Sequence, residues 1–227
     1  MIHKYGMKIS KNKNIHNIIS KYTNGNGIFI TDETINKVKR KRIYVDNSIN
    51  KHIQNWHKHI LFISKNRVDK YPHGEVGILS IITDNIDIIN SNDPYIQRLL
   101  SGIVILGDYN NINAGSNTDY IKALSIIKDS ELIFMHSHPN GDTFSYTDIN
   151  TFINTPTLGV LTVIGNNGNI YVLSKEYDFN EQNSRNFITS QVTKGLVEGF
   201  NIDKAKYEAA KNFLNNSSTF GITYIHD

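Results

Sequence analysis

The sequence predicts a mixed α/β domain, in which helices cover a sheet that is not purely parallel. Apolar runs of strand length alternate with segments whose apolar residues recur at helical spacing. Two of the runs, LGVLTVIG and NIYVLSK, flank Asn166-Asn167-Gly168, which is a hairpin signal. The 227 residues, 39% of them hydrophobic, are enough to bury a core.

The N-terminal part predicts a loop-like segment followed by two helices. Residues 1–27 are polar and rich in Asn, so we expect them to be loosely ordered. A helix is expected in residues 31–42, with Thr31 or Asp32 as its cap and acids in its first turn. Residues 48–64 predict a second helix. Its apolar face consists of Ile49, Ile53, Trp56, Ile60 and Ile63.

From Tyr71 the pattern changes to that of a sheet with interposed helices. The first expected elements are a strand in GEVGILSIIT, a turn at Asp84-Asn85 and a hairpin partner in IDIIN. A buried strand at 103–107, a loop at 110–117, a helix at 118–129, a strand in ELIFMHSH and a short helix from about Ser145 follow. The last elements are the hairpin of LGVLTVIG and NIYVLSK, a polar stretch beyond Tyr177, a helix at 203–215 and a terminal strand in FGITYIH.

Composition limits the chemistry and the surroundings of the protein. Because the chain has no cysteine, disulfides and thiolate metal sites are excluded, and any metal must be held by His and carboxylates. No stretch resembles a secretory signal or approaches about 18 apolar residues, so we expect a cytoplasmic protein without a membrane partner.

The net charge of +3 conceals a basic N-terminal region. Residues 1–70 hold 15 of the 24 Lys and Arg but only 4 of the 21 Asp and Glu. Such a region could bind nucleic acid, or the opposite charges could simply help two regions dock and stay soluble. The second interpretation is favoured, because no recognised nucleic-acid-binding motif accompanies the charge.

One segment, ELIFMHSHPNGDTFSYTDI, concentrates the candidate chemistry. In a strand, His136 and His138 point to the same face and can converge on one ion, and Pro139 disfavours helix at His138. Ser145 and Asp148 follow with the S-x-x-D spacing of a capping box, which by itself needs no metal. Two imidazoles and a carboxylate are nevertheless the ligands of a catalytic zinc that keeps a fourth position for water. We therefore predict a zinc site.

A second H-x-H pair shows that spacing alone is insufficient. His57 and His59 are followed by Asp69 at the same separation as in the predicted zinc site. They lie in the expected helix, where residues i and i+2 diverge by roughly 200° around the axis. We expect a solvated or packing pair there.

A hydrolase also needs a group that takes a proton from metal-bound water and passes it to the leaving amine. Glu75 in HGEVGILSI is the best candidate, because it is the only acid at the start of a buried strand, where burial can tune its pKa. The alternative is an ordinary surface Glu at a strand start. His73 nearby is assigned no role.

These residues resemble the JAMM (JAB1/MPN/Mov34, or MPN+) metalloprotease family. The family pattern is a Glu on an early strand, then H-[ST]-H-P, then S-x-x-D. It is matched by Glu75, by HSHP at 136–139 and by SYTD at 145–148, and the resemblance covers roughly residues 70–175.

The resemblance implies a curved mixed sheet flanked by helices, and zinc-dependent cleavage of a peptide or isopeptide bond. The partner would be a polypeptide substrate, including a ubiquitin-like protein. The implied roles are Zn²⁺ binding by His136, His138 and Asp148, general acid/base catalysis by Glu75, and oxyanion stabilisation by Ser145.

One feature departs from the commoner family form, which has ten residues between the second His and the Asp. Nine separate them here, similar to a prokaryotic and phage-type JAB branch. The chain is expected to divide into a basic, partly helical N-terminal region at 1–65, a JAMM-like domain at 66–180, and a C-terminal helix and strand at 181–227.

Two alternatives stay open. A JAMM-like scaffold without turnover could serve a larger phage, toxin or nucleic-acid-associated assembly, although inactive relatives usually lose ligands that this chain keeps. A metal-dependent nuclease fits the His and Asp residues and the basic arm, but the sequence lacks the carboxylate cluster of two-metal phosphodiester chemistry.

Overall fold

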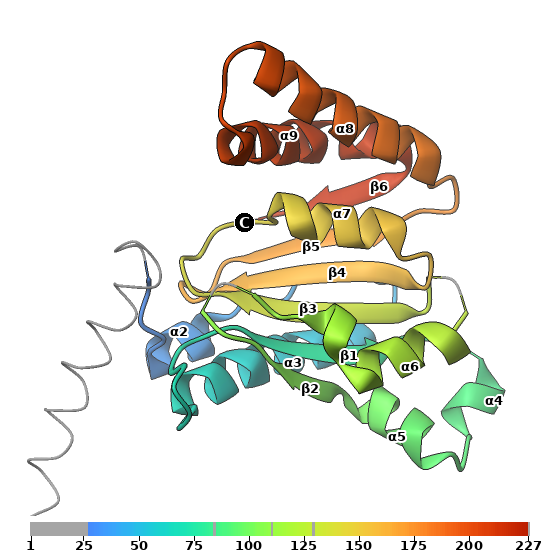
Figure 1. Ribbon diagram of the computed structural model, residues 1–227. Coiled ribbons are helices and arrows are strands. Elements are labelled where there is room, and N and C mark those ends of the chain that lie inside the picture. Colours follow the sequence, from blue (N-terminus) through green and yellow to red (C-terminus); the bar gives the residue numbers. More distant parts are fainter. Residues whose placement is uncertain (1–26, 84, 110, 129, 227) are drawn as a thin grey trace, which may run out of the picture.

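A six-stranded sheet with the strand order β2-β1-β3-β4-β5-β6 forms the centre of the molecule (Figure 1). The computed structural model describes residues 27–83, 85–109, 111–128 and 130–226, and these contain eight α-helices. The strands are β1 Val76–Ile81, β2 Ile103–Leu106, β3 Leu132–His138, β4 Leu158–Gly165, β5 Ile170–Lys175 and β6 Ile222–Ile225. The helices are α2 Asp32–Lys37, α3 Asn47–Asn66, α4 Ile86–Ile89, α5 Pro94–Ser101, α6 Thr118–Ile126, α7 Tyr146–Asn154, α8 Glu181–Val197 and α9 Ile202–Asn216.

The sheet is mixed, as the sequence predicts. β3 and β4 are parallel, and every other neighbouring pair is antiparallel. A parallel pair needs a crossover connection, and α7 supplies it between β3 and β4. This crossover brings the first turn of α7 back toward the end of β3.

Both faces of the sheet are buried at the central strands β1, β3 and β4. The predicted helical face of α3 is confirmed: Ile53, Trp56 and Ile60 pack with Ile78 of β1 and Ile133 of β3. Residues of α5, α6, α7, α8 and α9 form a second cluster with the opposite face. α8 and α9 lie against each other beyond α7 (Figure 1). The predicted region boundaries after residues 65 and 180 stay a prediction, although α3 covers the sheet and β6 extends it.

Two predicted elements are wrong. Ile86–Ile89 is the short helix α4, which Asn85 caps through its side chain, and β1 pairs with β2 and β3 instead. Asp84, in the predicted turn, lies outside the described residues. The polar stretch beyond Tyr177 contains α8, whose buried residues are Ser184, Ile188 and Gly195. Ile188, Val192 and Leu196 recur every fourth residue, but Leu196 is exposed and the first turns of α8 are polar, so no continuous apolar face predicts the helix.

Other elements are confirmed with shifted ends. α2 begins after the predicted cap Thr31 but ends at Lys37, and α6 ends at Ile126. The strand predicted as buried at 103–107 is the edge strand β2, and Val104 and Leu106 are exposed on one of its faces. The loop at 110–117 includes a turn of 3₁₀-helix. The segment 1–27, expected to be loosely ordered, falls outside the described residues except for Gly27.

No helix in the described part of the chain has both the length and the hydropathy needed to span a membrane.

Candidate metal centre

The three predicted ligands meet where β3 ends and α7 begins. His136 Nε2 lies 3.3 Å from Asp148 Oδ1, and His138 Nε2 lies 3.4 Å from Asp148 Oδ2. The two Nε2 atoms are 3.1 Å apart. Both histidines are buried. Among the described residues, this is the group of three His or carboxylate side chains that could hold a metal ion.

The capping box of α7 holds the carboxylate ligand. Asp148 N donates to Ser145 Oγ at 3.1 Å, and Ser145 N donates to Asp148 Oδ2 at 2.7 Å. The two interpretations of S-x-x-D therefore apply together, because the cap fixes the side chain that also reaches the histidines. Oδ1 has no part in the cap and faces His136.

The Nδ1 atoms of the two imidazoles have different surroundings. His138 Nδ1 donates to Asp142 O at 3.1 Å, which leaves the lone pair of Nε2 for a metal. His136 Nδ1 is buried and lies toward the backbone of Thr162 without forming a hydrogen bond. Ligand histidines usually donate their second N–H, so His138 matches that pattern more fully.

The three groups shift one another's pKa. Burial raises the pKa of Asp148, but the charges and hydrogen bonds of His136 and His138 outweigh it and hold that pKa well below its usual range. Burial lowers the pKa of His136 despite the adjacent carboxylate. Burial alone would lower the pKa of His138, but Asp148 and the charge of Glu75 outweigh this effect and raise the pKa to about 9. A cation bound to these nitrogens would displace the proton from His138.

Glu75 immediately precedes β1 and lines the same cleft as the three ligands. It is 6% exposed, which excludes the alternative of an ordinary surface Glu. Burial raises the pKa of Glu75 to about 8; the positive charge of His138 opposes this shift, while the charges of Asp148 and Asp108 add to it. A carboxyl group with such a pKa can exchange a proton near neutral pH.

Backbone hydrogen bonds fix Glu75 between β2 and β3. Glu75 N donates to Asp108 O at 2.7 Å, and Gly107 N donates to Glu75 O at 3.0 Å. Val76 N donates to Ser137 Oγ at 3.0 Å, and Ser137 lies between the two ligand histidines. The start of β1, which follows Glu75 directly, is thereby held in register with β3, which carries the imidazoles.

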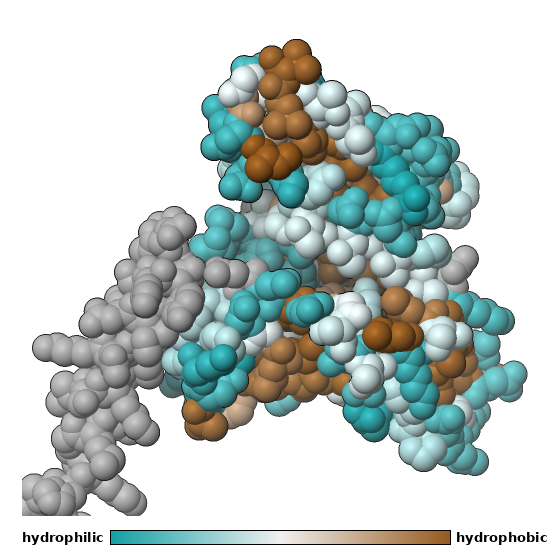
Figure 2. Space-filling model, viewed as in Figure 1, coloured by the Kyte–Doolittle hydropathy of each residue, from teal (hydrophilic) through white to brown (hydrophobic). Residues whose placement is uncertain are grey.

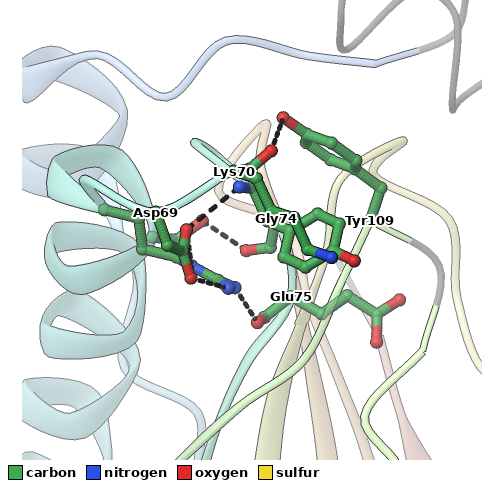
Figure 3. A network of polar contacts seen from close by, with 8 residues as sticks. Asp69, Lys70, Gly74, Glu75 and Tyr109 are labelled. Atoms are coloured by element: carbon green, nitrogen blue, oxygen red, sulfur yellow. Dashed lines mark hydrogen bonds and ion pairs between the residues drawn. The ribbon is translucent and has the colours of Figure 1, made fainter.

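Arg67, which the sequence reasoning missed, completes this support through its buried side chain. The side chain of Arg67 is 4% exposed, and its Nη1 donates to Glu75 O at 2.8 Å. Its Nε and Nη2 donate to the carboxylate of Asp69. The carboxyl group of Glu75 points away from this network (Figure 3). The R-x-D spacing was visible in the sequence, but only the fold brings Arg67 beneath the Glu75 carbonyl.

The two histidines of the second H-x-H pair have separate packing contacts, in agreement with the expected packing or solvated pair. His57 is buried in α3 with Nε2 2.7 Å from Thr162 Oγ1, and burial lowers its pKa to about 3. His59 stacks on Phe62 with the ring centroids 6.4 Å apart. Asp69, the carboxylate at the matching distance, pairs with Arg67 instead.

The three predicted ligands lie in a cleft of about 1030 Å³. Gly77 pairs with His136 across the strands, and a Cβ there would lie 2.7 Å from the ring of Phe134, which also lines the cleft. The cleft brings together all five predicted site residues: Glu75, His136, His138, Ser145 and Asp148.

The chain was compared with protein-family models, curated proteins and solved structures, and none of them matches it. Its site is therefore interpreted from its own geometry and chemistry.

Proposed function

We propose that the protein is a zinc-dependent metallopeptidase of JAMM type, which hydrolyses a peptide or isopeptide bond. The observation that carries this proposal is the approach of the three side chains: each Nε2 lies 3.3 to 3.4 Å from one of the two carboxylate oxygens of Asp148, and the two Nε2 atoms lie 3.1 Å apart. Tetrahedral zinc, with ligand bonds of about 2.0–2.2 Å, separates its ligands by about 3.3–3.6 Å. Three protein ligands leave the fourth position for water, which is the composition of catalytic zinc sites.

Zinc in this position would supply a water of lowered pKa and polarise the substrate carbonyl. Glu75 would take the proton from that water and return it to the leaving amine. Its burial, its raised pKa and its place in the same cleft support this role. The hydrogen bonds to its main chain limit its movement between the two proton transfers.

Ser145 would stabilise the oxyanion of the tetrahedral intermediate. Its Oγ accepts a hydrogen bond from Asp148 N, so the hydroxyl hydrogen can donate into the cleft that Ser145 lines. Removal of one such donor in other enzymes lowers the rate about 10²–10³-fold.

The JAMM assignment rests on the resemblance of the motif and is consistent with a mixed sheet flanked by helices. The substrate would be a polypeptide, with ubiquitin-like proteins as one class. The short nine-residue connection matters structurally, because Asp142 within it accepts the hydrogen bond that orients His138.

The proposal is tested by zinc analysis and peptidase measurements on the wild type, Glu75→Gln and a matched control, Glu198→Gln, which changes an exposed acid at the end of α8. We expect about one zinc per chain in all three proteins. Glu75→Gln should lose at least about 10²-fold in kcat, and the control should lose nothing. Loss of zinc from Glu75→Gln, or unchanged turnover, would contradict the assigned role.

A further inference from the structure

One side of α7 lines the cleft with uncharged polar side chains. Thr147, Asn150, Thr151 and Asn154 occupy positions i, i+3, i+4 and i+7, which share one face of a helix. The opposite side of α7 buries Ile149, Phe152 and Ile153 in the core. The polar side is therefore not required for packing. In Figure 2 the surface over α7 is white to teal, whereas hydrophobic patches lie where α8 joins α9 and in the part of the molecule below α7 in this view.

The facing wall of the cleft combines two asparagines with the apolar side chains of Ile112 and Ala114. Asn111 and Asn113 line it from the segment that follows β2. Amide side chains offer both donors and acceptors, and hydroxyl groups do so as well. An extended peptide backbone presents alternating N–H and C=O groups and needs both kinds of partner. The two walls together match the hydrogen-bonding needs of a peptide main chain.

The charge of the cleft restricts what can enter it. Its described lining residues include three carboxylates, Glu75, Asp142 and Asp148, and no Lys or Arg. Lys175 does approach Thr155 at the end of α7. Its Nζ donates to Thr155 O at 2.7 Å and lies 4.9 Å from the ring centroid of Phe152, on the core side. Along α7, away from the two histidines and the zinc that they would hold, a carboxylate or phosphate would therefore be desolvated without a cationic side chain to compensate it.

The length of the polar face sets the number of substrate residues that it can contact. From Asp148 to Asn154 the helix axis advances about 9 Å, at about 1.5 Å per residue. An extended peptide covers that distance in about three residues, at about 3.3 Å each. Since Asp148 is a metal ligand, this stretch begins at the reacting bond.

We infer that the cleft binds an extended, uncharged stretch of polypeptide along α7, about three residues long, on one side of the scissile bond. It selects against acidic side chains and against a free terminal carboxylate within that stretch. The protein therefore cuts within chains and does not release residues from a C-terminus. This inference rests on the proposed peptidase function and specifies its substrate.

The test uses the full zinc-loaded chain and a random dodecapeptide mixture, with cleavage sites read by mass spectrometry. The informative variant is Asn154→Lys, which places a cation at the far end of the polar face. Lys is favourable at a helix C-terminus, so the fold should be retained. The matched control is Asn216→Lys: Asn216 is also the last residue of its helix, and its Nδ2 likewise donates to a carbonyl four residues earlier.

For the wild type we expect Asp and Glu to be depleted at about three consecutive positions on one side of the cleaved bond. Asn154→Lys should raise their frequency about fivefold at the outermost of these positions, and Asn216→Lys should match the wild type. Three results would overturn the inference without affecting the proposed function. They are cleavage that tolerates Asp and Glu at every position, release of residues from the C-terminus of the peptides, and a cleavage profile of Asn154→Lys that equals that of the wild type. The absence of any cleavage by the zinc-loaded wild type would overturn the proposed function and the inference with it.

Discussion

Replacing Arg67 with Ala should reduce both the stability and the proposed activity of the protein without removing the proposed zinc. Arg67 contacts no predicted ligand; it donates to the main-chain carbonyl of Glu75 and to the carboxylate of Asp69. Its loss would free the main chain beneath the proposed base. The metal ligands would keep their own supports from the α7 cap and from Asp142.

The magnitude follows from the burial of each contact. A hydrogen bond from a charged, buried donor contributes about 1.5–3 kcal/mol, and this applies to the bond from Arg67 to Glu75 O. Asp69 is 42% exposed, so its ion pair contributes at most about 1 kcal/mol. We expect Arg67→Ala to lose about 2–4 kcal/mol in unfolding free energy and about tenfold in kcat/KM.

Asp69→Asn is the matched control, because it removes the ion pair and keeps the bond from Arg67 to Glu75. It should lose at most about 1 kcal/mol and little activity. Urea unfolding, zinc content and kcat/KM would be measured on both variants and the wild type. The reasoning is refuted if Asp69→Asn is impaired as much as Arg67→Ala, or if Arg67→Ala has the activity of the wild type.

Two further predictions concern the α7 cap and the buried histidine of α3. Ser145→Ala should lose about 1 kcal/mol of unfolding free energy, because Asp148 N loses its hydrogen-bond acceptor. It should also lose about 10²-fold in kcat, because the oxyanion loses a hydrogen-bond donor. An unchanged kcat would contradict the catalytic role. His57, whose pKa is held at about 3 by burial, stays neutral in the fold but takes up a proton in the unfolded chain below pH 6.5. Stability is therefore lost as the pH falls. Between pH 6.5 and 5.5, the unfolding free energy of the chelator-treated wild type should fall by about 1 kcal/mol more than that of His57→Gln. Urea titrations that give both proteins the same dependence of unfolding free energy on pH would refute this.

The candidate metal site could be predicted because its determinants are local. His136 and His138 share a strand face, Pro139 protects that geometry, and the capping box at Ser145 begins a helix wherever the chain folds back. These features lie within a short stretch of sequence. Glu75 could be predicted only in part, because its burial depends on strands and on Arg67, which pack around it from elsewhere.

The errors arise where distant contacts decide the structure. IDIIN has the composition of a strand, but β1 already pairs on both edges with β2 and β3, so no position beside it remains for a hairpin partner. β2 was predicted as buried because its residues are apolar, and its place at the edge depends on strand order. α8 is held by packing against α9 and has no continuous apolar stripe of its own.

The central claim is that His136, His138 and Asp148 hold a catalytic zinc ion, and a crystal structure of the zinc-loaded protein with the anomalous signal of zinc tests it most directly. We predict one zinc peak about 2.0–2.2 Å from both Nε2 atoms and from an Asp148 carboxylate oxygen, with water in the fourth position. A peak elsewhere, no peak, or a fourth ligand from the protein that closes the site would contradict the account.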